Sequence, residues 1–225
     1  MHPMDNQDFE AYADFKRFNA NVADTWVAAF CEAQQRLGKS PHKIRLLDYG
    51  CGDGKYFAHL TGIAGLLPEH VHGLEVSARR VQRCHELGWT QTQLQDIGSS
   101  RLPYDDGSFD LVNMMEVIEH VPRARIDVLL RELRRVLSPG GFLLVSSPNY
   151  PVKRFYDFSD ALLHRKWSRL RDDPTHVSPY THQSLQSLLF AHFASAEVRS
   201  FKDGYLYRRL QHPALRHKLF FLCQA

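Results

Sequence analysis

The sequence predicts an α/β fold built on a seven-stranded, mostly parallel sheet with helices on both faces. Between residues 44 and 146, short apolar runs with the length of strands alternate with amphipathic runs that have helical spacing. This alternation is typical of right-handed βαβ units, whose sheet is buried on both faces. An acid also follows each of four successive strands, and two later strands favour an antiparallel hairpin at one edge of the sheet.

The individual elements follow from apolar periodicity and from turn residues. Strands are predicted at 44–47, 71–74, 91–95, 109–114, 142–146, 196–201 and 217–223. Helices are predicted at 53–60, 77–87, 125–137 and 181–192. Ser77 and Thr181 are favourable N-caps for the second and fourth of these helices, and Gly88 ends the second.

Two segments interrupt the alternation. Residues 8–37 carry apolar positions at helical spacing, so we expect one or two helices within an N-terminal segment spanning 1–40. Residues 149–180 are aromatic and basic, with a weak helix predicted around 159–165. We expect this second segment to be a lid or acceptor-binding insertion over the carboxyl edge of the sheet.

The composition is that of one globular domain covering 1–225. The 225 residues are 44% hydrophobic and 24% charged, and the formal net charge of +3 argues against a surface devoted to nucleic acid. No apolar run approaches the ~20 residues that span a bilayer, and the N-terminus lacks the pattern of a secretory signal. The four cysteines include no C-x-x-C pair. We therefore expect a cytoplasmic protein with reduced thiols.

The turn after the first predicted strand is the most informative stretch. Residues 48–54 read Asp-Tyr-Gly-Cys-Gly-Asp-Gly, an acid followed by glycines at every second position. Glycine is needed where the backbone takes left-handed angles or where a ligand touches the main chain. A dinucleotide-binding fingerprint would need its third glycine at position 55, which is Lys55. The spacing therefore favours a turn that binds a ligand other than a dinucleotide. The alternative is an ordinary tight strand–helix turn that binds no ligand.

The acids after the strands indicate where that ligand lies. In parallel sheets, ligands bind outside the carboxyl ends of the strands, and Asp48, Glu75, Asp96 and Glu116 all follow such ends. Glu75 lies about twenty residues past the glycine turn, where one carboxylate can accept hydrogen bonds from both hydroxyls of a ribose. Asp96 is placed to accept from an adenine amino group, while the N–H of Ile97 donates to the ring.

Five motifs, in this order and spacing, resemble the class I S-adenosylmethionine-dependent methyltransferase superfamily. They are Asp48–Gly54, Glu75, Asp96-Ile97, Leu-Pro-Tyr-Asp-Asp-Gly-Ser-Phe-Asp-Leu-Val at 102–112, and Leu-Ser-Pro-Gly-Gly at 137–141. The pattern is similar to the group of ubiquinone-biosynthesis O-methyltransferases and methyltransferases of types 11 and 23. The resemblance covers roughly residues 44–150, and it implies a Rossmann-like fold and S-adenosylmethionine as cofactor without specifying the acceptor.

The resemblance also implies which residues face each part of the cofactor. These are Asp48, Gly50 and Gly52 for the methionine part, Glu75 for the ribose, Asp96 and Ile97 for the adenine, and Met115 for the sulfonium side, with Cys51 and Val76 beside them.

A second constellation follows the fourth strand, in Glu-Val-Ile-Glu-His-Val-Pro at 116–122. If a helical turn starts here, Glu116, Glu119 and His120 share one face at i, i+3 and i+4. They could bind a divalent cation, or one could act as a general base. The stretch resembles ubiquinone-pathway O-methyltransferases and small-RNA 2′-O-methyltransferases, in which an equivalent group and a downstream His are associated with metal. His176 is the downstream candidate here, and the alternative is that Glu119 and His120 only cap and orient the turn.

These features predict an S-adenosylmethionine-dependent methyltransferase that methylates oxygen on a small, lipid-linked or sugar-linked acceptor. His120 is the first candidate for the base and His176 the second, with Glu119 beside them. One alternative is a metal-assisted RNA 2′-O-methyltransferase, which predicts a wide basic cleft. Another is a scaffold subunit that holds the cofactor without turnover. The oligomeric state is left open.

Overall fold

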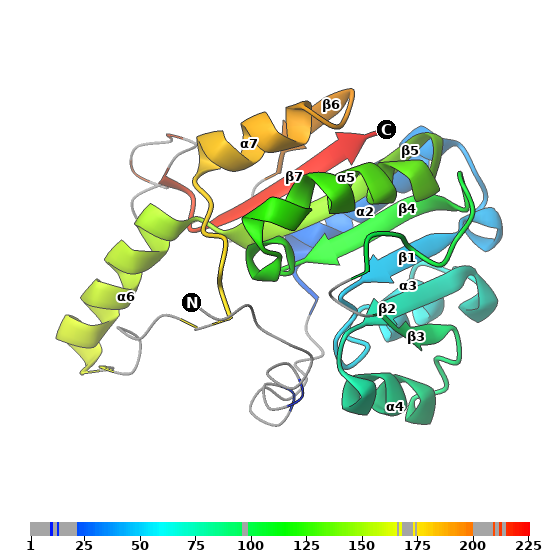
Figure 1. The fold of residues 1–225 in the computed structure, drawn as a ribbon, viewed down its shortest axis with the longest axis horizontal. Helices are drawn as coiled ribbons and strands as arrows, with labels where there is room; N and C mark the ends of the chain where they lie inside the picture. The colour runs from blue at the N-terminus through cyan, green and yellow to red at the C-terminus, as the bar shows by residue number, and fades with distance from the viewer. Residues whose placement is uncertain are drawn as a thin grey trace.

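The computed structural model describes residues 10, 13, 22–95, 99–165, 167, 173, 175–199, 209, 212 and 215–225. Figure 1 shows a central twisted sheet with helices on both sides. Among the described residues, no helix combines the length and apolar character that crossing a bilayer would require.

The sheet has the predicted seven strands, in the order β3-β2-β1-β4-β5-β7-β6. The order reverses between β1 and β4, so the topological switch point lies there. Strands β1 to β5 pair in parallel, whereas β7 is antiparallel to both of its neighbours, β5 and β6. The bounds are β1 Leu46–Tyr49, β2 Val71–Glu75, β3 Thr92–Leu94, β4 Phe109–Met115, β5 Leu137–Pro148, β6 Ser195–Val198 and β7 Lys218–Gln224.

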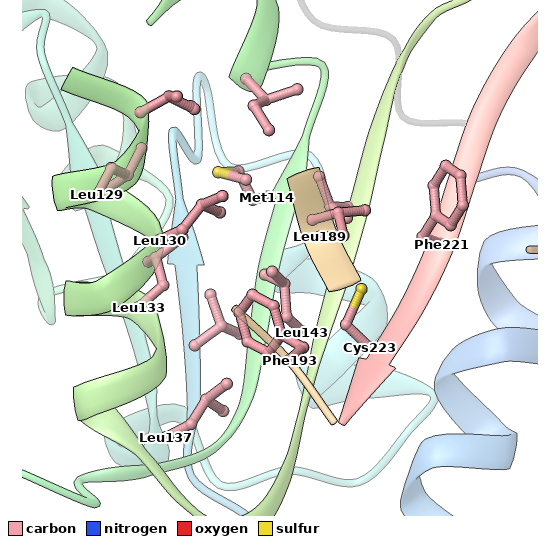
Figure 2. Close-up of a cluster of buried hydrophobic side chains, with 14 of the residues drawn as sticks. Met114, Leu129, Leu130, Leu133, Leu137, Leu143, Leu189, Phe193, Phe221 and Cys223 are labelled. Atoms are coloured by element: carbon pink, nitrogen blue, oxygen red, sulfur yellow. The ribbon is translucent and has the colours of Figure 1, made fainter. Parts of the chain in front are cut away.

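Helices cover the two faces of the sheet and bury one apolar cluster on each. They are α2 Asp24–Leu37, α3 Phe57–Gly62, α4 Ala78–Glu86, α5 Arg123–Val136, α6 Tyr150–His164 and α7 His182–Phe190, with 3-10 turns at Pro41–Lys43, Pro68–His70 and Ile118–His120. α5 and α7 pack on one face, and α2, α3 and α4 pack on the other. Figure 2 shows Leu130 and Leu133 of α5 in the first cluster, near Met114 of β4. Truncating either leucine to alanine would cost roughly 2–5 kcal/mol.

Two predicted starts move by several residues, and the causes are local. Helix α3 begins at Phe57, whereas the sequence predicted a start at residue 53. Gly54 has a φ of 80°, in the left-handed region, and an α-helix cannot contain such a residue. β5 begins at Leu137 instead of residue 142, since Gly140 at φ 76 lets the strand bend. The register between β4 and β5 shifts at that bend.

The 149–180 insertion holds a longer helix than the sequence predicted. α6 runs for 15 residues from Tyr150, instead of forming a weak helix near 159–165. Pro151 is compatible with this early start, because a proline in the first turn loses no intrahelical hydrogen bond. In Figure 1, α6 extends away from the sheet.

The N-terminal segment is described only in part. α2 confirms a helix within the predicted 1–40 segment, and its Trp26 and Phe30 are fully buried on the sheet. Of the residues before it, only Glu10, Ala13 and the two that lead into the helix fall within the described part of the chain. The remainder of the predicted N-terminal helices lies outside the described residues.

Candidate active site

The glycine turn follows β1 and is packed too closely for larger residues. Gly50, Gly52 and Gly54 have φ values of +74°, +58° and +80°. A Cβ added to Gly50 would lie 2.4 Å from Cγ2 of Val117, which follows β4. The amides of Gly50 and Cys51 both donate to the carbonyl of Leu74, at 2.8 and 3.1 Å. Glycine at position 50 is therefore required both by its backbone angle and by the space around it.

Glu75 closes β2 and organises this turn through its carboxylate. Its Oε2 accepts from the Gly52 amide at 2.8 Å, and its Oε1 accepts from the Val76 and Ser77 amides at 3.0 and 3.1 Å. Burial raises the pKa of Glu75, while the charge of Arg80 and the backbone hydrogen bonds oppose that rise. A carboxylate has about four acceptor positions, so three bonds leave Oε2 able to accept a ribose hydroxyl.

Asp48, the residue before the last one of β1, is a fully buried acid with one satisfied oxygen. Its Oδ1 accepts from Nδ2 of Asn113 at 2.7 Å, and Asn113 Oδ1 in turn accepts from the Trp26 indole at 2.8 Å. Its Oδ2 is buried with no hydrogen-bond partner among the described residues. Burial raises the pKa of Asp48 to about 7, with a smaller contribution from the charge of Glu75. An unsatisfied oxygen beside a glycine turn fits a ligand that brings a donor or a positive charge.

The remaining predicted cofactor residues divide into two groups. Cys51, Val76 and Met115 lie at the ends of β1, β2 and β4, and Cys51 and Met115 are buried. Asp96 and Ile97 lie outside the described residues. The chain before them is placed, since the Gln95 amide donates to the Glu75 carbonyl at 2.8 Å.

Glu116 does not join the predicted metal set. It has φ 57, in the left-handed region, and the 3-10 turn begins only at Ile118, so the expected i, i+3, i+4 face is not formed. Its Oε1 accepts from the Ser146 hydroxyl at 2.8 Å, and its Oε2 pairs with Nζ of Lys218 at 3.0 Å. These contacts to β5 and β7 direct the carboxylate to a different group of side chains.

Glu119, His120 and His176 do come together. One ligand atom from each lies within 4.8 Å of the other two, and the two imidazole rings are 4.8 Å apart. Glu119 is fully buried, and neither of its oxygens makes a hydrogen bond of regular geometry among the described residues, although the Ser147 hydroxyl lies close enough to oppose the rise of its pKa. Burial, and then the charge of Glu116, raises the pKa of Glu119 well above its usual range. Two imidazoles and a carboxylate are a donor set for a divalent cation and also for proton transfer.

Backbone contacts hold His176 against the 3-10 turn. The Ser178 amide donates to the Glu119 carbonyl at 2.9 Å, and the Ser178 hydroxyl donates to the Val121 carbonyl at 2.7 Å. On the other side, Nδ1 of His120 contacts the Thr175 carbonyl at 3.0 Å. A carbonyl only accepts, so this nitrogen carries the proton and Nε2 carries the ring lone pair. The hydroxyl of Tyr150, at the start of α6, bonds Nδ1 of His176.

Sequence reasoning missed several residues that shape this edge of the sheet. Asn113 and Trp26 position Asp48, Tyr150 bonds His176, and Lys218 pairs with Glu116. The apolar strand around Asn113 gave one usable signal, because a buried amide must find hydrogen-bond partners. The others depend on long-range contacts for which the sequence holds no local pattern.

Comparison with known proteins matches this arrangement. A family model described as a methyltransferase domain matches residues 18–192. The chain belongs to the methyltransferase domain family. This membership agrees with the predicted class I S-adenosylmethionine-dependent superfamily, and the glycine turn, Glu75 and the topological switch point lie at one edge of the sheet.

Solved methyltransferase structures share the fold across almost the whole chain. An S-adenosylmethionine-dependent methyltransferase from Aquifex aeolicus superposes with a TM-score of 0.61 at 15% identity, covering 98% of each chain. One from Archaeoglobus fulgidus has a TM-score of 0.60 at 16% identity, covering 90% of this chain and 95% of that one. At such low identities the likeness shows the fold alone.

Curated relatives are similar over just under half of this chain. A ubiquinone biosynthesis O-methyltransferase of Xanthomonas oryzae pv. oryzae is 38% identical over 120 residues, which are 47% of this chain and 43% of the relative. The 27-O-demethylrifamycin SV methyltransferase of Amycolatopsis mediterranei is 34% identical over 115 residues, which are 46% of this chain and 40% of that relative. The chain spans less than half the length of either relative.

Proposed function

We propose that this chain transfers a methyl group from S-adenosylmethionine to a hydroxyl oxygen of a small acceptor, including lipid-linked and sugar-linked ones, with His120 as the general base. The observation that carries the proposal is the cluster of Glu119, His120 and His176 just past the end of β4. The O-methyltransferase names of two relatives support oxygen as the methylated atom.

The glycine turn and the acids beside it would hold the cofactor. The unsatisfied Oδ2 of Asp48 matches the positive charge of a methionine amino group, and Oε2 of Glu75 matches a ribose hydroxyl. Gly50, Cys51, Gly52, Val76 and Met115 would line the cleft, and Asp96 and Ile97 are proposed to contact the adenine. When bound, S-adenosylmethionine supplies a methyl group on an electrophilic sulfonium.

The protein then has to align the acceptor and remove its proton. The bond between Nδ1–H of His120 and the Thr175 carbonyl would fix the tautomer in which Nε2 is the nitrogen that accepts that proton. Glu119 would stabilise the imidazolium that forms once its own carboxyl group has ionised, because a nearby carboxylate favours the charged ring. His176 is the second candidate for the base. General-base catalysis of this kind contributes roughly 10²–10⁴-fold to the rate.

The test is S-adenosylhomocysteine release with a panel of phenolic, sugar and lipid-linked hydroxyl acceptors. We expect His120→Gln to lower kcat by roughly 10²-fold or more and to leave the affinity for S-adenosylhomocysteine unchanged. An accepted substrate methylated on nitrogen or carbon would refute oxygen as the target. Full activity of His120→Gln would refute the role of His120 as the general base. Cofactor binding without release on any acceptor would favour the scaffold reading.

The second candidate function is metal-assisted 2′-O-methylation of RNA, and it is favoured by the two unsatisfied oxygens of buried Glu119. Glu119, His120 and His176 would hold the cation, without Glu116. We expect Mn²⁺ to raise the melting temperature of the wild type but not of Glu119→Gln. Activity on an RNA 3′ end that chelator abolishes would establish this function in place of the first.

We further propose that the protein acts in the cytoplasm as a single methyltransferase domain spanning 1–225. The 149–180 segment would form one wall of the acceptor site, since Tyr150 and His176 both belong to it and bond each other.

A further inference from the structure

Helix α6 exposes an apolar face. Phe155, Phe158 and Leu162 recur at i, i+3 and i+7, which places them on one side of the helix. They are 52%, 60% and 62% exposed, and Leu163 and Trp167 are 73% and 61% exposed. Among the described residues, five of the nine exposed large hydrophobic side chains therefore fall between 155 and 167.

The opposite side of α6 contains an ion pair whose side chains are much less exposed. Lys153 and Asp157 pair at 2.6 Å, and their side chains are only 20% and 14% exposed. Asp160 shares this side by its spacing, as do the exposed His164 and the buried Ala161. The residues that α6 buries are themselves apolar or aromatic, namely Tyr150, Val152 and Ala161, so Phe155, Phe158 and Leu162 form a further apolar face that is exposed. Such a face requires an apolar partner outside the described chain.

The charges near this face favour a lipid surface. Arg154 and Arg165 are exposed beside it, and the sequence continues with further basic residues at 166, 169 and 171 before the first acid at 172. The two aspartates of α6 lie on the opposite side, so the apolar face itself carries no acid. Apolar and aromatic side chains bordered by cations are the features of helices that lie in the surface of an anionic bilayer.

The shape and position of α6 agree with this partner. The helix extends away from the sheet in Figure 1, and a convex helix needs no groove to be accepted by lipid. Its first residue, Tyr150, bonds His176 of the candidate site. We propose that the apolar face of α6 docks the protein onto the surface of a bilayer containing anionic lipid. The docked helix lies in the interface beside the site, so an acceptor can arrive from the lipid phase.

The experiment is co-flotation of the full chain with vesicles of phosphatidylcholine alone and with added phosphatidylglycerol. We expect strong binding only with phosphatidylglycerol, and weaker binding at high salt. The double variant Phe158→Ser/Leu162→Ser should lose roughly a hundredfold in partitioning, since each buried side chain contributes about tenfold or more. Arg165→Asn should lose roughly fivefold on phosphatidylglycerol vesicles. Asparagine tolerates the left-handed angles of position 165, where φ is 53.

The chain offers a matched control in Ile63→Ser/Phe190→Ser, at side chains that are 76% and 51% exposed on other elements. We expect this control to bind vesicles like the wild type. No flotation of the wild type at any phosphatidylglycerol content overturns the proposal, and so does an equal loss in both double variants. If light scattering shows a dimer that only the α6 variant disrupts, the face binds a second copy instead. A melting temperature lowered only by the α6 variant means that the chain covers this face itself. Flotation involves no methyl transfer, so its outcome is separate from that of the proposed chemistry.

Discussion

The two halves of the carboxyl edge of the sheet differ in how completely their polar groups are satisfied. At β1 and β2, the Glu75 carboxylate accepts three backbone amides, and the glycine turn is fastened to Leu74. At β4 and β5, Glu119 is buried with two unsatisfied oxygens, and Glu116 is held at a left-handed backbone angle. The first half is organised mainly by backbone hydrogen bonds and leaves one acid oxygen, Oδ2 of Asp48, for a ligand, whereas in the second half both oxygens of Glu119 are left.

The two halves also differ in how far apart along the chain their residues lie. In the half near β1 and β2, the glycine turn, Leu74 and Glu75 lie within about thirty residues of one another. The half near β4 and β5 gathers residues from β4, α6, β7 and the stretch around His176. A change in one distant segment can therefore alter the second half without disturbing the first.

The largest effect is expected when the half near β1 and β2 is overfilled. Gly50→Ala places a Cβ 2.4 Å from Val117 Cγ2 at a φ of +74°, so both overpacking and backbone strain oppose folding. We expect a loss of about 3 kcal/mol in the free energy of unfolding and loss of S-adenosylhomocysteine binding. Urea denaturation and calorimetric titration measure the two effects.

Gly88→Ala is the matched control, because its φ is +85° but no atom lies within 4 Å of the added Cβ. Gly88→Ala should lower the free energy of unfolding by the backbone strain alone, about 1–2 kcal/mol. It should leave S-adenosylhomocysteine binding unchanged. Adding Val117→Ala to Gly50→Ala should restore part of the lost stability. If Gly88→Ala lowers the free energy of unfolding as much as Gly50→Ala does, the close contact with Val117 contributes nothing to the loss at Gly50.

An intermediate effect is expected at Asp48, whose folded pKa of about 7 exceeds the ordinary 3.8. Between these values the native state holds a proton that the unfolded chain has released, so stability falls as pH rises from about 4 to about 7. Asp48→Asn should remove this dependence, add roughly 1–3 kcal/mol at pH 8 and weaken S-adenosylhomocysteine binding. Urea denaturation midpoints between pH 4 and 8 measure how the stability of each protein depends on pH.

Asp110 provides the contrast for that measurement, because it is equally buried and lies at the opposite edge of the sheet. Burial acts to raise the pKa of Asp110, but hydrogen bonds from Lys39 and the Arg45 amide lower it overall. Its contribution to stability is present above the unfolded pKa and is lost as pH falls, so Asp110→Asn should destabilise the protein at pH 8. If both substitutions changed the stability at pH 8 in the same direction, the opposite pKa shifts of Asp48 and Asp110 would be contradicted.

The smallest effect on stability is expected in the half near β4 and β5. Lys218→Met breaks the 3.0 Å pair with Glu116, but both side chains are 35% exposed. Such pairs contribute less than about 1 kcal/mol. We expect an almost unchanged urea midpoint and unchanged S-adenosylhomocysteine binding, with the change confined to kcat or KM for the acceptor. A clear loss of cofactor affinity would show that the two halves are not separable.

The sequence predicted the local parts of this molecule well. The strand ends, the glycine turn and the caps depend on neighbouring residues, and the side chains of Ser77 and Thr181 do cap α4 and α7. The position of Glu116 could not be predicted in this way, because its contacts come from Ser146 and Lys218, 30 and 102 residues away. The outward apolar face of α6 was also missed, since aromatic and leucine residues in a sequence normally indicate burial.

The place of β7 has a consequence for how the chain is made. Within the described residues, β6 joins the sheet by pairing with β7, which is inserted between it and β5. During synthesis, residues 195–198 emerge before the strand that will hold them, and Glu116 emerges about a hundred residues before Lys218. The half-sheet from β1 to β5 can therefore assemble while translation continues. The acceptor side becomes complete only when residues 218–224 have left the ribosome.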